Sequence, residues 1–213
     1  MKIYDISQEV FSCAVYPGDP QPQKQILCST ETGGLYNLTS FAMCAHNGTH
    51  VDAPFHFLTN GKTVDQMDLN IFVGRCYIAK HHGEVTAADA EAILRKANGA
   101  ERILIAGKAT VTAEAAKVFA SGKIKLLGNE GQTVGPENAP MQVHLILLHR
   151  GIALLEGIVL NGVPEGWYFL SAAPLNLGGA DGAPCRAYLI DWEDEMNPCI
   201  QFCKAEHIAE TQG

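Results

Sequence analysis

The stretch RILIAGKATVTAEAAKVFASGKIKLL, residues 102–127, holds the pattern that decides the fold class. Its first segment, Arg102–Ala106, is an aliphatic run typical of a buried strand. Thr112–Ser121 is an alanine-rich segment of high helix propensity, and Gly122 is well placed to end that helix. Ile124–Leu127 is another short apolar run. A strand, a helix and a second strand in this order predict an α/β unit.

The same alternation continues on both sides of this stretch. Arg75–Lys80 is apolar and β-prone, and Thr86–Asn98 is predicted to be a helix with Thr86 as its N-cap. Pro136–Gly151 is predicted to be a helix that opens with proline and stops at glycine. Further strands are predicted at Lys2–Ser7, Gln25–Thr30, Leu38–Cys44, Ile152–Glu156, Tyr168–Ala173 and Cys185–Ile190. The sequence therefore predicts an α/β fold, and we expect a single domain over residues 1–213.

Composition argues against several classes of function. The 213 residues carry a formal net charge of −8, and an acidic surface repels nucleic-acid phosphates. No apolar run approaches the roughly 20 residues of a membrane-spanning helix, and the N-terminal sequence MKIYDISQEV has no apolar signal core. The seven cysteines are odd in number and scattered, which is typical of thiols in a reducing compartment. We expect a cytoplasmic protein without nucleic-acid or membrane partners.

One short segment concentrates groups that bind metals. His46-Asn-Gly-Thr-His50-Val-Asp52-Ala-Pro-Phe-His56 places three histidines and a carboxylate within eleven residues. Neutral imidazole and carboxylate are ligands that zinc and similar metals prefer in catalytic sites. His50 and Asp52 are two residues apart, so an extended segment would direct both side chains to one side. Four candidate ligands at this density predict a metal site.

The same segment is predicted to be a strand that leads into a tight turn. His46 and His50 have the spacing of a zincin helix, but that motif needs glutamate directly after the first histidine, and the residue there is Asn47. Gly48 and Pro54 also disfavour a helix. Gly48 would let the backbone pass close to a metal ion.

A second pair of ionisable residues lies about a hundred residues downstream. His144 falls in a mostly apolar predicted helix, and Glu156 ends an apolar predicted strand. Buried ionisable groups are costly unless they are paired or bound to a metal. A salt bridge or a hydrogen bond would explain either residue alone. Together they would add an imidazole and a second carboxylate to the first cluster.

The motif His46-x-Gly-Thr-His50-x-Asp52-x-Pro54-x-His56 resembles the signature of the cyclase-like family of metal-dependent hydrolases, which includes bacterial kynurenine formamidases and isatin hydrolases. Similarity extends to the turn Tyr16-Pro-Gly-Asp-Pro20, to Gly128–Val134, and to Gly182-Ala-Pro-Cys-Arg186. The resemblance implies a swivelling β/β/α fold with a mixed, barrel-like sheet core flanked by helices. It also implies a homodimer or a homotetramer.

The resemblance further implies a role for each candidate site residue. The implied metal ligands are His46, His50, Asp52, His144 and Glu156. The first three would bind one divalent ion, and Asp52 and Glu156 would bridge to a second. His56 would transfer protons, and Tyr16, where formamidases often carry tryptophan, would line the substrate pocket. Zinc is the expected metal and manganese the alternative, with one or two ions per subunit.

The implied activity is hydrolysis of a C–N amide bond by metal-activated water, with His56 as proton shuttle. The expected substrate is a small aryl formamide such as N-formylkynurenine, which would place the enzyme in tryptophan catabolism. An isatin-like lactam or another cyclic amide fits the same chemistry. A non-catalytic metal-binding or ligand-binding protein is the alternative from a different class, and the presence of His56 argues mildly against it.

Other enzyme classes lack their defining residues. A serine hydrolase would need a Gly-x-Ser-x-Gly elbow, which the sequence does not contain. A zinc deaminase is a closer alternative because His82-Gly-Glu84 matches its first motif. Its second motif would fall on Pro198–Cys203, where the cysteines are one residue too far apart. Asp181, in a glycine-rich loop, is predicted to be a turn former.

Overall fold

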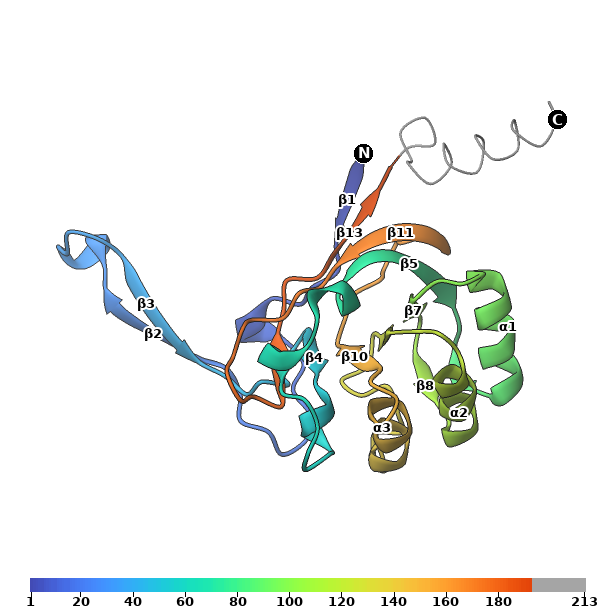
Figure 1. The fold of residues 1–213 in the computed structure, drawn as a ribbon. Helices are drawn as coiled ribbons and strands as arrows, with labels where there is room; N and C mark the ends of the chain where they lie inside the picture. Colours follow the sequence, from blue (N-terminus) through green and yellow to red (C-terminus); the bar gives the residue numbers. More distant parts are fainter. Residues whose placement is uncertain (193–213) are drawn as a thin grey trace.

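Nine strands of the chain form one mixed sheet in the computed structural model, which describes residues 1–192 (Figure 1). In spatial order they are β1 (Lys2–Asp5), β13 (Tyr188–Asp191), β11 (Gly166–Ser171), β5 (Val73–Lys80), β7 (Arg102–Ala106), β9 (Leu126–Asn129), β10 (Ala153–Glu156), β4 (His50–Asp52) and β12 (Gly182–Pro184). The four central strands, β5, β7, β9 and β10, pair in parallel, and the strands on both sides pair antiparallel. The predicted α/β class with a mixed sheet is confirmed.

Three helices connect the parallel strands. Parallel neighbours need a crossover connection, and α1 (Ala87–Ala97), α2 (Ala113–Ser121) and α3 (Met141–Leu148) supply one between each consecutive pair. The N-cap predicted for α1 is present, because the Thr86 hydroxyl accepts a hydrogen bond from the Asp89 N–H. Asn98 ends this helix in the left-handed conformation, with φ of 36°.

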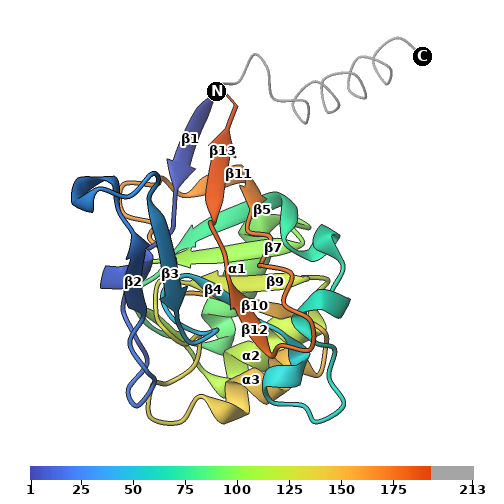
Figure 2. The same cartoon turned by 90° about the vertical axis from the view of Figure 1, so that its left-hand side faces the viewer.

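The sheet curls into a half-barrel because its two ends are joined by a short connection. β12 lies at one edge and β13 is second from the other, about 34 Å away if the sheet were flat at about 4.8 Å per strand. Only residues 185–187 separate the two strands in sequence, and this connection reaches at most about 14 Å. Figure 2 shows the chain passing from β12 into β13. The edges must therefore lie close together.

The strand predicted at Cys185–Ile190 begins three residues too early for the same reason, because β13 starts at Tyr188. Residues 185–187 leave one sheet edge and join the other, so they cannot pair as a continuous strand. Their backbone bonds to two different segments: the Cys185 N–H donates to the Thr49 carbonyl (3.1 Å), and the Ile6 N–H donates to the Ala187 carbonyl (3.0 Å). Every other strand predicted above is present with its ends within two residues, whereas β6 (Gly83–Val85), β8 (Ala109–Val111) and β12 were not predicted.

Helix α3 begins later than the prediction of Pro136–Gly151. Pro140 has no backbone N–H, and inside a helix its ring would clash with the carbonyl four residues before it. The residue therefore stands at the N-cap of α3, and residues 136–140 form a turn in which the Ala139 N–H donates to the Pro136 carbonyl (3.0 Å). The helix begins at Met141 and brings His144 into its first turn.

The central sheet is buried on both faces. Along β10, Leu154 packs in the apolar cluster under the three helices, and its neighbour Leu155 packs in the cluster inside the curl. Successive side chains of a strand point to opposite faces, so the parallel strands have continuous apolar sequences. None of the helices in residues 1–192 combines the length and apolar character that crossing a membrane requires.

A two-stranded hairpin extends away from this body (Figure 1). It consists of β2 (Gln23–Cys28) and β3 (Leu38–Ala42), paired antiparallel. Cys13, Cys28, Cys44, Cys76 and Cys185 are free thiols, as expected for a protein without a disulfide framework. Cys199 and Cys203, and with them the second deaminase-like motif, lie outside the described residues.

Replacement of either central leucine by alanine should destabilise the fold to a similar extent. Leu154→Ala and Leu155→Ala each remove a fully buried side chain, on opposite faces, and each should lower the free energy of unfolding by about 2–5 kcal/mol. Leu69→Ala, at a leucine that is 63% exposed, is the matched control and should have little effect. Denaturant unfolding measures all three, and a tolerated Leu154→Ala would contradict burial on both faces.

Candidate metal centre

The pairing of β4 with β10 places three ionisable side chains on one face of the sheet. His50 and Asp52 are two residues apart on β4 and share a face. In the antiparallel register Glu156 of β10 lies opposite His50, and Leu154 lies opposite Asp52. Directly opposed residues point to the same side of a sheet, so Glu156 joins the two residues of β4. After β4 the chain makes a single 3-10 turn at Pro54–His56. The strand and the tight turn predicted for this segment are therefore confirmed.

His144 of α3 completes a buried group of four. His144 Nε2 lies 3.3 Å from Asp52 Oδ2 and 3.2 Å from Glu156 Oε1. His50 Nε2 lies 3.4 Å from Asp52 Oδ1 and 3.5 Å from Glu156 Oε2. All four side chains are at most 3% exposed. The two predicted halves of the site, about a hundred residues apart in sequence, therefore meet in the fold.

Backbone groups fix the orientation of these ligand candidates. His50 Nδ1 lies 2.9 Å from the Gly48 carbonyl, and His144 Nδ1 lies 2.9 Å from the Pro140 carbonyl. A carbonyl only accepts hydrogen bonds, so each Nδ1 carries the proton and each Nε2 faces the carboxylates. Glu156 Oε1 accepts a hydrogen bond from the Val134 N–H (2.8 Å). Such supporting contacts orient metal-binding side chains.

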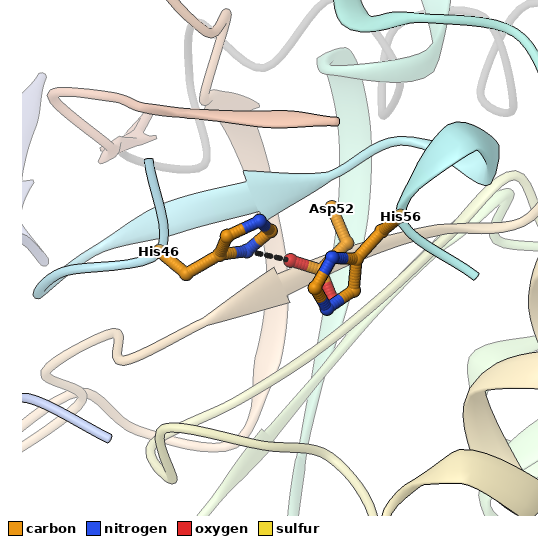
Figure 3. A group of neighbouring side chains, drawn as sticks. All are labelled: His46, Asp52 and His56. Atoms are coloured by element: carbon orange, nitrogen blue, oxygen red, sulfur yellow. Dashed lines mark hydrogen bonds and ion pairs between the residues drawn. The ribbon is translucent and has the colours of Figure 1, made fainter. Parts of the chain in front are cut away.

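His46 and His56 lie beside the first group, with Asp52 between the two (Figure 3). His46 Nδ1 lies 2.8 Å from Asp52 Oδ1, and the His46 and His56 ring centroids are 4.1 Å apart. Asp52 thus belongs to both groups of candidate ligands, His46–Asp52–His56 and His50–Asp52–Glu156. All five predicted ligands and the predicted proton-transfer residue are brought together in one place.

Asp181 is part of this site, although the sequence predicted only a turn former. Its Oδ2 lies 2.8 Å from His46 Nε2 and 3.2 Å from His56 Nδ1. The following residue, Gly182, permits this approach, since a Cβ there would lie 2.7 Å from His46 Cε1. A single aspartate in a glycine-rich loop has no periodicity or spacing that distinguishes it from a turn residue. Only the return of β12 to β4 brings it to the histidines.

Opposing effects shift the pKa values of the buried groups. Burial would lower the pKa of His50 and of His144, but hydrogen bonds to Asp52 and Glu156 outweigh it and raise both to about 10. Burial would raise the pKa of Asp52, but its contacts with His144, His46 and His50 hold it well below its usual range. For His56 burial dominates and lowers the pKa below 6.5. Burial therefore favours the neutral form of the His56 imidazole.

The residues of this site fit a divalent metal ion. Two buried carboxylates side by side need compensating positive charge. Asp52 Oδ2 is buried without an aligned hydrogen bond in residues 1–192. The donors that converge here are imidazole nitrogens and carboxylate oxygens, which suit zinc, manganese and iron.

A cavity of about 410 Å³ opens onto these side chains, a size that suits a small molecule. Tyr16, predicted to contact substrate, lines it together with Phe57, Gln132 and Asp181. The Tyr16 hydroxyl donates a hydrogen bond to the Glu137 carbonyl (2.5 Å) and so ties the N-terminal turn to the loop before α3. A larger cavity of about 610 Å³ lies at the root of the hairpin and contains none of the candidate ligands.

Known proteins of one family are similar to this chain. The model of the Cyclase family matches residues 4–136, more than half of the chain. The kynurenine formamidase of Bacillus cytotoxicus is 34% identical over 203 residues, which cover 87% of this chain and 95% of that protein. The kynurenine formamidase of Salinibacter ruber is 33% identical over 211 residues, covering 91% and 100%.

Solved structures share the fold. A potential metal-dependent hydrolase with cyclase activity superposes with a TM-score of 0.76 at 29% identity, over 90% of this chain and 98% of that one. Isatin hydrolase A from Labrenzia aggregata superposes with a TM-score of 0.79 over 90% and 94% of the two chains, and at 19% identity this likeness concerns the fold alone. The half-barrel is the fold of a metal-dependent hydrolase, and the buried cluster supplies candidate metal ligands. The chain belongs to the Cyclase family.

Removal of either buried carboxylate should abolish tight metal binding. Changes in outer-shell partners alone weaken metal sites about 10–100-fold, so Asp52→Asn and Glu156→Gln should each cost more than about 100-fold in the Kd for Zn²⁺ or Mn²⁺. Saturating metal should raise the Tm of the wild type but not of these variants. Titration calorimetry and thermal melts measure both effects. Glu114→Gln, at an exposed glutamate of α2, is the control, and unchanged affinity in Asp52→Asn would contradict the assignment.

Proposed function

We propose that this hydrolase cleaves an aryl formamide, and that N-formylkynurenine is its substrate, which would place it in tryptophan catabolism. The observation that carries the proposal is a buried cluster of imidazole and carboxylate donors with a further imidazole, His56, beside it in one cavity. Its relatives among the kynurenine formamidases, 34% and 33% identical, support this choice of substrate.

The proposed ligands are His46, His50, Asp52, His144 and Glu156. A divalent ion bound there would lower the pKa of a water molecule towards 7 and polarise a carbonyl group. Zinc is the proposed metal and manganese the alternative. The side chains of Asp52 and Glu156 would offset the positive charge, and the hydrogen bonds from Nδ1 of His50 and His144 would hold their rings in place.

His56 is proposed to take a proton from the attacking water and to deliver it to the leaving nitrogen. An amide nitrogen is a poor leaving group unless it gains a proton as the C–N bond breaks. Contact of His56 Nδ1 with the Asp181 carboxylate (3.2 Å) favours the tautomer with the proton on Nδ1 and leaves Nε2 for proton exchange. Asp181 would therefore act as a positioning residue for His56. Tyr16 and Phe57 provide aromatic surface in the same cavity for the substrate ring.

The first test is hydrolysis of N-formylkynurenine by metal-loaded and chelated protein. We expect metal-dependent turnover with a kcat/KM above roughly 10⁴ M⁻¹s⁻¹. Equal activity in the chelated protein would refute metal dependence. A metal-loaded protein that opens isatin but ignores the formamide would assign the lactam as the substrate class. Turnover of neither would favour a non-catalytic binding protein.

Substitutions should separate proton transfer from metal binding. His56→Ala should keep its metal and its Tm and lose about 10²–10⁴-fold in kcat. Asp181→Asn should lose about 10–100-fold, the range for a supporting contact. His149→Ala, at an exposed histidine that follows α3, is the control and should match the wild type. Near-normal turnover in His56→Ala would remove this residue from the mechanism.

We also propose that two copies associate through the β2–β3 hairpin. The hairpin and its tip expose large apolar side chains, among them Leu35 (96% exposed) and Ile26 (65%), and a two-stranded hairpin alone is marginally stable in water. The cavity of about 610 Å³ at its root is lined by apolar residues that include Phe11, Phe41 and Leu175. In a two-fold dimer the apolar hairpin of each copy would pack in the apolar recess of the other.

Light scattering after size-exclusion chromatography tests this association. The wild type should elute as a dimer, or as a tetramer if a second interface exists. Ile26→Glu with Leu35→Glu should give a folded monomer, whereas Leu69→Glu, at an exposed leucine outside the hairpin, should not change the mass. A monomeric wild type would overturn the proposal.

A further inference from the structure

Gln132 is the one residue of the catalytic cavity whose side-chain amide is wholly unpaired in the described part of the chain. It lies between β9 and α3 and lines the cavity beside His50, His144 and Glu156. Its Oε1 and Nε2 are both buried, and neither has a hydrogen-bond partner among residues 1–192. Leaving a buried donor and acceptor unpaired costs free energy, so a group in this position calls for a partner.

The backbone on both sides of Gln132 is fixed, so its position is a property of the fold. The Gly131 carbonyl accepts a hydrogen bond from the Gly157 N–H (2.7 Å). The Thr133 carbonyl accepts one from Asn129 Nδ2 (3.1 Å). The next residue, Val134, donates its N–H to Glu156 Oε1 (2.8 Å). The segment is thus tied directly to one of the proposed metal ligands.

The amide of Gln132 occupies space that a glycine leaves open. A Cβ on Gly157 would lie 2.4 Å from Gln132 Nε2, so the amide rests against the backbone that follows Glu156. The carbonyl of Gly157 is already taken, since it accepts hydrogen bonds from Gln8 Nε2 (2.7 Å) and from the Thr49 hydroxyl (2.6 Å). Other donors therefore use the Gly157 carbonyl, and both the N–H groups and the oxygen of the Gln132 amide remain without a partner among residues 1–192.

We propose that Gln132 is a specificity-determining residue that hydrogen-bonds the amide group of the substrate. This role rests on the amidohydrolase activity proposed above. The oxygen of a carboxamide accepts hydrogen bonds, and it therefore complements the N–H of a secondary amide. Both polar atoms of the Gln132 side chain are buried, so the contact requires a change of rotamer about the single bonds of the side chain. Its Oε1 then accepts the substrate N–H, a contact that an ester cannot provide.

The inference predicts a preference for amides over esters that depends on this one side chain. Gln132→Met has a similar length and no hydrogen-bonding group. In the metal-loaded full chain it should leave the Tm unchanged or higher, because an unpaired buried amide is removed. Its kcat/KM for formanilide should fall about 5–10-fold, the value of one net hydrogen bond. Its kcat/KM for phenyl formate, corrected for spontaneous hydrolysis, should stay at the wild-type value.

Each other outcome has a defined meaning. Gln142→Met, at an exposed glutamine of α3, is the matched control. A clear fall in the Tm of Gln132→Met would show that the amide has an internal partner such as a buried water, and would overturn the inference. Equal losses on both substrates, or no loss on formanilide, would also overturn it.

Failure of the proposed activity can be told apart from failure of this inference. A wild type that hydrolyses neither probe refutes the activity. In that case calorimetric titration of metal-loaded protein with formanilide decides the role of Gln132. Binding about 5–10-fold weaker in Gln132→Met would support amide recognition, and equal binding would exclude it.

Discussion

The site depends on the burial of the Asp52 carboxylate among histidines. His46, His50 and His144 approach its two oxygens at 2.8, 3.4 and 3.3 Å, and its side chain is 1% exposed. A buried carboxylate is costly without positive charge nearby. A second buried carboxylate, Glu156, lies against the same imidazoles. This concentration of negative charge in apolar surroundings favours the binding of a cation at the site and disfavours the binding of an anionic group.

The sheet determines this arrangement more than the sequence motif does. Antiparallel pairing of β4 with β10 aligns His50 with Glu156, and pairing of β4 with β12 returns Asp181 to the histidines. A slip of one residue in either pairing would turn these side chains to the opposite face. Gly157, with φ of 65°, lets the chain turn directly after Glu156 where a Cβ would lie 2.2 Å from the Gly48 carbonyl. Strand register and one glycine therefore set the geometry.

Local sequence signals predicted the parts of the fold that short-range chemistry controls. Thr86 caps its helix as its spacing to Asp89 indicated, and the strand at Arg102–Ala106 has the predicted ends. The crossing at residues 185–187 was missed, because no local pattern shows that the chain changes sheet edges there. Asp181 and Gln132 were missed as site residues for a related reason. Each lies in a loop rich in small residues, and only long-range strand pairing brings it to the cavity.

The central claim is that Asp52, Glu156 and the histidines around them hold the catalytic metal. The most direct measurement is anomalous diffraction from crystals of the metal-loaded protein, recorded at the absorption edge of the metal. The claim predicts a peak about 2.0–2.2 Å from an Asp52 carboxylate oxygen and from imidazole nitrogens of its neighbours. A fully loaded protein whose only peak lies away from these side chains would contradict it.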